Sequence, residues 1–262
     1  MPRFQESAFV LRKWDFGESD QVVSLLTRGK GRLRGIAKGA KRSKKRFGGL
    51  LSPFMMIQVE CFEKQTGELV RVEGCTLLRY FSRIQEDLPK LLMGCTVLEV
   101  MDRLLPEGET GHGFFQLAEE SFSYLEAEEE GLGSFPTKFF LKVVALLGLE
   151  PQFGNCVHCR RRIAPAGLFG FSVPQGGAVC GSCIRRGTAT HRVSAQTLSM
   201  LRKWLWAPLS EPSGCDCLPS AVGEAEAILS AFISFHAGRD LRSLQVLRKI
   251  FAAQAGLNRK DV

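Results

Sequence analysis

The chain has 262 residues, a length that suits about two domains. Hydrophobic residues make up 45% and charged residues 24% of it, which is the composition of a folded protein and excludes wholesale disorder. The mean hydropathy is −0.01, and the longest apolar stretch, residues 139–149, is interrupted by Lys142, so we expect no membrane-spanning segment. Because four acidic side chains interrupt the first twenty residues, we expect no signal peptide. They are Glu6, Asp15, Glu18 and Asp20.

The formal net charge of +8 belongs to the first third of the chain. Residues 1–79 contain 16 Lys and Arg against 8 Asp and Glu, whereas residues 80–262 contain 19 of each sign. Within residues 28–46, here called the basic segment, ten residues are basic and none is acidic, so a polyanion is the natural partner. The alternative interpretation is a solvated loop, or an RNA- or lipid-headgroup patch, of no specific purpose. The ten are Arg28, Lys30, Arg32, Arg34, Lys38, Lys41, Arg42, Lys44, Lys45 and Arg46.

The first 79 residues read as short strands separated by turns. Each run contains β-branched or aromatic residues, and residues 16–20 and the Thr66-Gly67 pair have turn composition. Five short strands within this length favour a small barrel of the OB kind, and an SH3-like barrel would give the same pattern. The predicted strands are residues 8–14, 21–27, 32–37, 54–62 and 69–77.

From Leu88 onward the apolar residues recur with the period of helices. Ser134 and Ser194 are placed to cap helices, Pro136 suits a first helical turn, and Gly148 suits a helix end. We interpret the apolar stripes as the core of a helical bundle. The predicted helices are residues 88–106, 114–125, 134–147, 194–205 and 221–236.

Four cysteines form two C-x2-C pairs with twenty residues between them. Each pair turns two thiolates toward one point, and two pairs complete the tetrahedral sulfur shell that Zn²⁺ accepts. No coordination position stays open, so we expect one structural zinc ion per chain and not a catalytic one. Arginines at 160–162 and 185–186 can offset the negative charge of the four thiolates. The predicted ligands are Cys156, Cys159, Cys180 and Cys183.

The chain has nine cysteines, an odd number that does not suit a disulfide scaffold, so we expect a reducing cytosol. A thioredoxin-like redox role requires a C-x2-C at a helix start in a βαβ context, which this sequence lacks. We interpret His158 as exposed and not bound to metal, and Cys215 and Cys217 as free loop thiols. The three remaining cysteines fit strand and helix interiors as small apolar residues. They are Cys61, Cys75 and Cys95.

Catalytic signatures are absent from the sequence. It contains no G-x4-G-K-[ST] phosphate loop, no HExxH and no GxSxG motif. His112, His191 and His236 each stand alone along the chain. We therefore expect a binding protein and not an enzyme.

Several motifs follow one another in a fixed order. The two most specific are Ala37-Lys-Gly-Ala-Lys-Arg42 and the run 140–151 that leads into Cys156-x-x-Cys159. The others are Glu18 and Asp20 followed by residues 22–27 and Gly31, then Leu51-Ser-Pro-Phe54, and residues 236–244, HAGRDLRSL. In this order and over essentially its full length, the chain resembles the RecO family of bacterial recombination mediators.

The resemblance implies an N-terminal OB-fold, a helical domain and a zinc-binding insert, which agree with the segments read from the residues. We therefore predict an α+β multidomain protein, with a five-stranded OB-fold β-barrel followed by an α-helical bundle domain that carries an inserted four-cysteine zinc ribbon. The expected domains are 1–79, the DNA-binding OB-fold; 80–155, the first helical part; 156–185, the zinc-binding insert; and 186–262, the second helical part.

The resemblance also implies a non-catalytic mediator that binds single- and double-stranded DNA, anneals complementary strands and works with RecR. Together these proteins help to load RecA onto strands coated by single-stranded-DNA-binding protein (SSB). A protein with this role acts in the cytoplasm, at the nucleoid, with no membrane partner. The alternative functions are an RNA- or ribosome-associated OB/zinc-ribbon module and a protein-interaction scaffold.

The basic segment is the predicted contact with the phosphate backbone, and nearby aromatic side chains are candidates for base stacking. A core position is the alternative for two of these aromatics, Trp14 and Phe54. Arg239 and Arg242 are a candidate second basic contact, and ion pairs inside the helical domain are their alternative. The aromatic candidates are Trp14, Phe16, Phe47 and Phe54.

Overall fold

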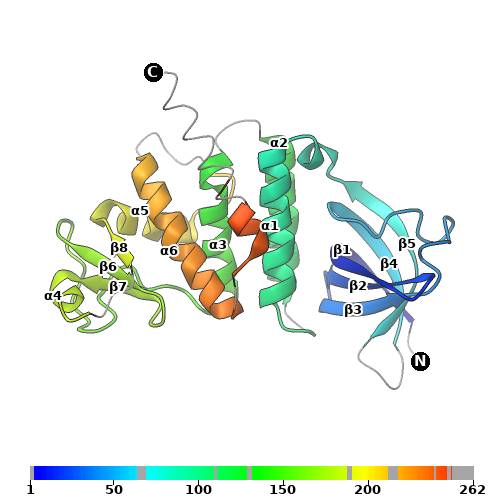
Figure 1. Ribbon diagram of the computed structural model, residues 1–262, viewed down its shortest axis with the longest axis horizontal. Helices are drawn as coiled ribbons and strands as arrows, with labels where there is room; N and C mark the ends of the chain where they lie inside the picture. Colours follow the sequence, from blue (N-terminus) through cyan, green and yellow to red (C-terminus); the bar gives the residue numbers. More distant parts are fainter. Residues whose placement is uncertain are drawn as a thin grey trace. The chain divides into compact units, whose positions relative to one another are not determined.

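The computed structural model describes residues 3–63, 69–108, 111–128, 132–187, 191–211, 218–238, 240–246 and 249. The chain divides into two compact units, unit 1 (Met1–Ala127 with Gln245–Val262) and unit 2 (Glu128–Leu244). Figure 1 labels the strands and helices of each unit. None of the described helices combines the length and the apolar character that crossing a membrane requires.

Unit 1 begins with five strands: β1 (Arg3–Phe16), β2 (Asp20–Thr27), β3 (Gly31–Ala37), β4 (Met55–Phe62) and β5 (Val70–Tyr80). They close into a barrel with the strand order β1-β2-β3-β5-β4, in which β4 pairs with β1 to complete the circle. All neighbours are antiparallel except β3 and β5, which run parallel. This topology is that of the OB fold and excludes the SH3-like alternative.

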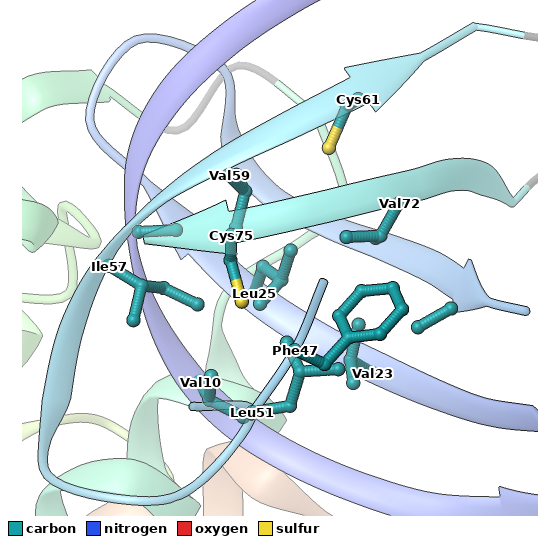
Figure 2. Packing of buried hydrophobic residues seen from close by; sticks show 12 residues of the cluster. Val10, Val23, Leu25, Phe47, Leu51, Ile57, Val59, Cys61, Val72 and Cys75 are labelled. Carbon is teal, nitrogen blue, oxygen red and sulfur yellow. The ribbon is translucent and has the colours of Figure 1, made fainter. Parts of the chain in front are cut away.

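The barrel interior is filled partly by residues that do not belong to strands. Inward-facing strand residues such as Val23, Leu25 and Val59 are fully buried. Phe47 and Leu51, from the connection between β3 and β4, point in among them (Figure 2), and each is 2% exposed. Because burial of these two side chains is favourable, the connection that carries the end of the basic segment is anchored to the barrel.

A second apolar cluster packs two helices of unit 1 against the barrel, α1 (Leu88–Leu104) and α2 (Gly111–Ala127). The ring of Phe9 on β1 lies with its centroid 5.0 Å from that of Phe115 and 5.2 Å from that of Phe122, both on α2. These helices therefore share a compact unit with the barrel, whereas the expected domain boundary at residue 79 places them with the later helices.

Phe54 belongs to this second cluster and not to a strand. We expected a strand from residue 54, but β4 begins at Met55, and Phe54 lies in the preceding turn with a φ of 62°. Its ring packs edge-on against Phe122 with the centroids 5.8 Å apart. Gly94 on α1 approaches the ring so closely that a Cβ there would lie 2.6 Å from Phe54 Cε1, so only glycine fits.

Unit 2 combines helices with a small sheet. The helices α3 (Phe135–Leu146), α5 (Ala195–Trp206) and α6 (Pro219–Ala237) pack against one another. The strands β6 (Phe169–Ser172), β7 (Gly177–Cys180) and β8 (His191–Val193) form a sheet in the order β7-β6-β8, and the single turn α4 (Gly181–Ile184) follows β7. An OB barrel followed by a helical region with an inserted ribbon of strands confirms the predicted fold class.

The two predicted serine caps in unit 2 differ in outcome. Ser194 Oγ accepts a hydrogen bond from the Thr197 N–H at 3.1 Å, which confirms the cap of α5. Ser134 precedes α3 but accepts no capping bond from it. Its own backbone is already helical, because it ends the 3₁₀ turn Leu132–Ser134, so the expectation of a cap there is wrong.

Aromatic packing ties the small sheet to the helices of unit 2. Phe171 on β6 is fully buried, and its ring centroid lies 6.2 Å from that of Phe153 and 6.0 Å from that of Phe232 on α6. Gly177 lets the chain ahead of the first cysteine pair lie against β7, since a Cβ there would lie 2.7 Å from the carbonyl oxygen of Gln152. The ribbon is therefore held by protein contacts as well as by its cysteines.

Replacing Phe47 by Ala removes the largest side chain that the β3–β4 connection contributes to the barrel. We expect urea denaturation to show a loss of about 3–5 kcal/mol in unfolding free energy, the usual cost of the cavity left by a buried Phe. Phe16→Ala is the matched control, because Phe16 is 56% exposed. The control should change stability by no more than about 0.5 kcal/mol. Equal stabilities for the two variants would contradict the anchoring role of Phe47.

Candidate functional site

The first part of the basic segment is tied to carboxylates of unit 1. Arg32 on β3 is 9% exposed, and its Nε donates to the carbonyl oxygen of Leu105 at 2.7 Å. Its other guanidinium nitrogens lie 3.7 Å from Asp102 Oδ1 and 3.6 Å from Glu107 Oε1. Arg34 Nε lies 2.6 Å from the same Glu107 oxygen. Charge-assisted hydrogen bonds thus join β3 to the end of α1.

Arg28 and Lys30, between β2 and β3, also have carboxylate partners. Arg28 Nη2 lies 3.1 Å from Glu119 Oε2 on α2, and its guanidinium lies 4.7 Å from the centroid of the Phe115 ring. Lys30 Nζ lies 3.0 Å from Glu63 Oε1. Both basic side chains remain about two-fifths exposed, at 42% and 41%, so each keeps a solvent-facing side.

The last six basic residues lie on residues 38–46, here called the basic loop, between β3 and β4. Lys41 Nζ lies 3.0 Å from Asp15 Oδ2, and Arg42 Nη2 lies 3.8 Å from Glu18 Oε2, both on the β1–β2 hairpin. Hydrogen bonds from Lys41 and then from Gln21 hold the pKa of Asp15 below its usual value. The basic loop therefore lies beside the β1–β2 hairpin.

Other cations of the basic loop make fewer contacts with carboxylates. Lys44 and Lys45 are exposed and make no ion pair with any described residue. Arg46 Nη2 donates to the carbonyl oxygen of Lys38 at 2.8 Å, and its guanidinium lies 5.1 Å from the centroid of the Phe47 ring. Arg46 thus closes the loop on itself, while both lysines are available to an external anion.

Asp20 fixes the start of the basic loop. Its carboxylate accepts a hydrogen bond from the Gly39 N–H at 2.8 Å and one from the Ser19 hydroxyl at 2.9 Å. These two bonds, the Gly39 bond first, hold the pKa of Asp20 below its usual value of 3.8. The carboxylate is therefore ionised at neutral pH, and the backbone of the loop is held at one end by Asp20 and at the other by Phe47.

The end of β1 carries an exposed aromatic and basic face. Arg12, Trp14 and Phe16 occupy alternate positions of the strand and so share one face. Trp14 is 38% and Phe16 is 56% exposed, and the Arg12 guanidinium lies 5.6 Å from the Trp14 ring centroid. Phe47 and Phe54 are 2% and 3% exposed, so neither candidate can stack on bases, and the core alternative for Phe54 is confirmed. The sequence analysis did not include Arg12 among the candidate binding residues. Its position directly after the apolar run of β1 indicates an exposed side chain and could have identified it.

The four predicted cysteine ligands come together in unit 2. Their sulfur atoms all lie within 4.8 Å of one another, and those of Cys159 and Cys180 are 3.6 Å apart. A tetrahedral site with Zn–S distances of about 2.3 Å places its sulfur atoms about 3.8 Å apart. The cluster can therefore hold one metal ion and is consistent with zinc. Its members are Cys156, Cys159, Cys180 and Cys183.

Backbone hydrogen bonds shape the first cysteine pair into a tight turn. The Arg160 N–H donates to the carbonyl oxygen of Cys156 at 2.8 Å, and the Cys156 N–H donates to that of Arg161 at 2.8 Å. Arg160 takes the left-handed conformation, with a φ of 61°, at the close of this turn. The Cys180 N–H donates to Cys156 Sγ at 3.4 Å and so links the second pair to the first.

Hydrogen bonding and burial oppose each other at Cys156 and Cys180 but act together at Cys183. The Ser182 hydroxyl lies 3.2 Å from Cys180 Sγ and lowers the pKa of that thiol to about 6. Burial opposes ionisation of Cys156, but backbone N–H groups, that of Cys159 foremost, lower its pKa. Burial, then hydrogen bonds among the sulfur atoms, raise the pKa of Cys183 to about 12. A cation among the four sulfur atoms would favour the ionised form of all of them.

The other predicted positions fall as follows. Cys61 and Cys75 lie in the barrel wall, where burial raises their pKa to about 12 and about 11. His158 is exposed and is not part of the cysteine cluster. Arg242 is exposed and interacts within the fold. Three positions lie outside the described residues: Arg239, Cys215 and Cys217.

Comparison with known proteins gives the family of this chain. The family model described as "Recombination protein O N terminal" matches residues 1–81, and the model described as "Recombination protein O C terminal" matches residues 85–245. The chain belongs to the RecO family. Both halves of the fold, the OB barrel and the helical region, fall within these matches, and the resemblance noted from the motifs is confirmed.

Curated relatives of this RecO-family chain match it over nearly its whole length. The DNA repair protein RecO of Myxococcus xanthus is 35% identical over 258 residues, which cover 98% of this chain and 100% of the relative. That of an Anaeromyxobacter species is 32% identical over 253 residues, covering 95% and 96%. That of Streptomyces griseus is 31% identical over 256 residues, covering 95% and 100%. The chain is thus a RecO-family DNA repair protein.

Sequence reasoning about the basic segment of this RecO-family chain missed its internal partners. The segment itself contains no acid, but Glu63, Glu107 and Glu119 reach it from positions far along the chain. No local sequence signal identifies such pairs. The structure thus separates cations that serve the fold, Arg32 above all, from those that face solvent.

Replacing Arg32 by Gln would leave Asp102 and Glu107 without their cation. We expect thermal or urea unfolding to show a loss of about 2–3 kcal/mol, because the network is largely shielded from water. Lys44→Gln removes the same charge from an exposed side chain of the same segment and should alter stability by no more than about 0.5 kcal/mol. Wild-type stability of Arg32→Gln, combined with weaker DNA binding, would contradict the structural role.

Proposed function

We propose that this chain is a non-catalytic recombination mediator in DNA repair. It binds single- and double-stranded DNA, anneals complementary strands and, with RecR, helps to load RecA onto single-stranded DNA coated by SSB. The observation that carries the proposal is the basic loop, held on an OB barrel beside an exposed aromatic face. The relatives are named DNA repair proteins, which supports DNA as the target.

The basic loop is the proposed contact with the phosphate backbone. Lys44 and Lys45 reach solvent without an ion pair to a described residue, and Arg42 meets Glu18 only at 3.8 Å, where both side chains are more than 70% exposed. Exposed pairs of this kind are weak, so a phosphate can replace the carboxylate at little cost. Each phosphate held on single-stranded DNA should steepen the logarithmic salt dependence of affinity by about 0.7.

Neighbouring side chains extend this contact. Trp14 and Phe16 are placed to stack on bases, and stacking is worth about 1–3 kcal/mol per base. Arg28, Lys30 and Arg34 keep between 41% and 43% of their side chains exposed, so they can border the same surface. Both duplex and single strands carry the phosphates that the cations bind, whereas only unpaired bases can stack.

Annealing follows from charge neutralisation and needs no catalytic group. Two DNA strands repel each other, and a protein that neutralises both lets complementary bases meet. RecR, SSB and, indirectly, RecA are the partners in this proposal, and the site of action is the cytoplasm, at the nucleoid. Arg239 and Arg242 are proposed as a second basic contact, toward DNA or the acidic tail of SSB.

We also propose that the cysteine cluster holds one structural Zn²⁺ per chain. Four thiolates fill a tetrahedral shell, so the site leaves no position for a substrate. The ion would join the first cysteine pair to the second and so close the ribbon. A ribbon of this size cannot bury an adequate core of its own, and a metal commonly compensates for that.

Purified protein should contain about one zinc ion per chain by atomic emission, and chelation should release it. We expect release to lower the melting temperature and to make the four thiols of the cluster reactive toward a thiol reagent. Cys156→Ser should lose the zinc, because it removes one ligand. Cys95→Ser, at a half-buried cysteine of α1, is the matched control and should retain it. Full zinc content in Cys156→Ser would refute the site.

The mediator role is tested by annealing two complementary oligonucleotides that are both precoated with SSB. We expect salt-sensitive annealing by the wild-type protein, with RecR added in a parallel series. Lys44→Gln/Lys45→Gln should lower the logarithmic salt slope of single-stranded DNA binding by about 1.4, from two lost phosphate contacts. Arg83→Gln, at an exposed arginine outside the basic segment, should leave the slope unchanged.

Three results would count against the proposal. An unchanged slope in Lys44→Gln/Lys45→Gln would remove the basic loop from the DNA contact. Failure to anneal coated strands in the presence of RecR, with binding to naked strands intact, would leave a nucleic-acid binder without the mediator role. Tighter binding of structured RNA than of single-stranded DNA would favour an RNA-associated module.

A further inference from the structure

Part of unit 2 is strongly basic, although the net charge of residues 80–262 is zero. Residues 151–210 contain eight Lys and Arg and no Asp or Glu, whereas residues 80–150 contain 5 basic and 13 acidic residues. All eight cations are exposed, so each can meet an external anion. They are Arg160, Arg161, Arg162, Arg185, Arg186, Arg192, Arg202 and Lys203.

None of these eight cations makes an ion pair with a described residue. The basic segment differs, because Arg28, Arg32 and Arg34 each meet a carboxylate there. A polyanion can therefore approach this surface without displacing an internal partner.

Arg162 and Arg202 border the same groove, which has a volume of about 680 Å³. Arg162 follows the first cysteine pair, and Arg202 lies on α5, so the groove joins the ribbon to the helix. Its lining between these arginines includes the apolar side chains of Ile163, Pro165 and Leu198. The groove thus offers two cations at its border and an apolar lining between them.

The exposed face of α5 adds an aromatic side chain to these cations. Arg202, Lys203 and Trp206 are spaced three and four residues apart, so they lie on one side of the helix. Trp206 is 74% exposed, the largest exposure of any large hydrophobic side chain in the described residues. An indole beside two cations can stack on a base while the cations hold the flanking phosphates.

We propose that the exposed face of α5 and the groove bordered by Arg162 and Arg202 form a second binding surface for single-stranded DNA, here called the ribbon surface. The choice of DNA as the ligand rests on the proposed function. An acidic protein segment would also match the charge, but the exposed indole favours a partner with stacking bases. One chain would then hold two strands, one on the basic loop and one on the ribbon surface.

The first test counts the strands bound per chain. The zinc-loaded, full-length protein is titrated with oligo(dT) of about 12 nucleotides, a length within the usual range of a single site. We expect two strands per wild-type chain and one for Arg162→Gln/Arg202→Gln/Lys203→Gln, because the variant loses three phosphate contacts at the ribbon surface. Arg83→Gln is the control and should bind two strands.

Tryptophan fluorescence gives a second test that does not depend on the triple variant. In Trp14→Phe the remaining indoles are Trp204, which is 3% exposed, and Trp206. We expect oligo(dT) to quench the fluorescence of this variant, and no quenching in Trp14→Phe/Trp206→Phe. Trp206→Ala should weaken the ribbon surface by about fivefold or more. Phe235→Ala, at an exposed aromatic of α6, should not weaken it.

The outcomes separate this inference from the proposed function. If wild type and triple variant each bind one strand with the same salt slope, the ribbon surface does not bind DNA, while binding by the basic loop stands. If the triple variant still binds two strands but loses affinity for a deca-glutamate peptide, the surface docks an acidic protein and the inference is overturned. If the wild-type protein binds no oligo(dT) at all, the proposed function itself fails.

Discussion

The six cations of residues 38–46 repel one another, and that repulsion favours an extended, solvated connection between β3 and β4. Burial of Phe47 inside the barrel opposes it, because the ring leaves water and also lies under the guanidinium of Arg46. Asp20 holds the other end of the connection through the Gly39 N–H. The charges are therefore displayed from a fixed backbone, and the proposed DNA contact depends on that anchoring.

The two units use positive charge in different ways. In unit 1, the guanidinium of Arg32 joins β3 to the end of α1, so part of the charge holds the fold together. In unit 2, the residues between 151 and 210 include no carboxylate, and packing relies on Phe171 and on the cysteine cluster. A charge that the fold does not need is available for recognition, whereas one that supports packing is protected from competition by ligand.

Local patterns in the sequence predict the strands, the helices and the cysteine site well, because each depends on residues that are close together along the chain. The C-x2-C spacing predicts that Cys156 and Cys159 face one point, and the structure places them so. Contacts between distant residues are not predictable in this way. Glu119 meets Arg28 across 91 positions, and Phe47 enters the barrel from a connection that shows no strand pattern. The net charge of residues 80–262 is zero, but this total conceals an acidic stretch, residues 80–150, followed by a basic one, residues 151–210.

The burial of Cys61 and Cys75 has a chemical consequence for the whole chain. With pKa values of about 12 and about 11, these thiols are almost never ionised at neutral pH, and thiolates are the species that oxidants and alkylating agents attack. The ribbon is the opposite case, because Cys159 of its cysteine cluster is exposed. Oxidative damage should therefore begin at the ribbon whenever its thiols are unprotected, and an aged preparation should lose its ribbon before it loses its barrel.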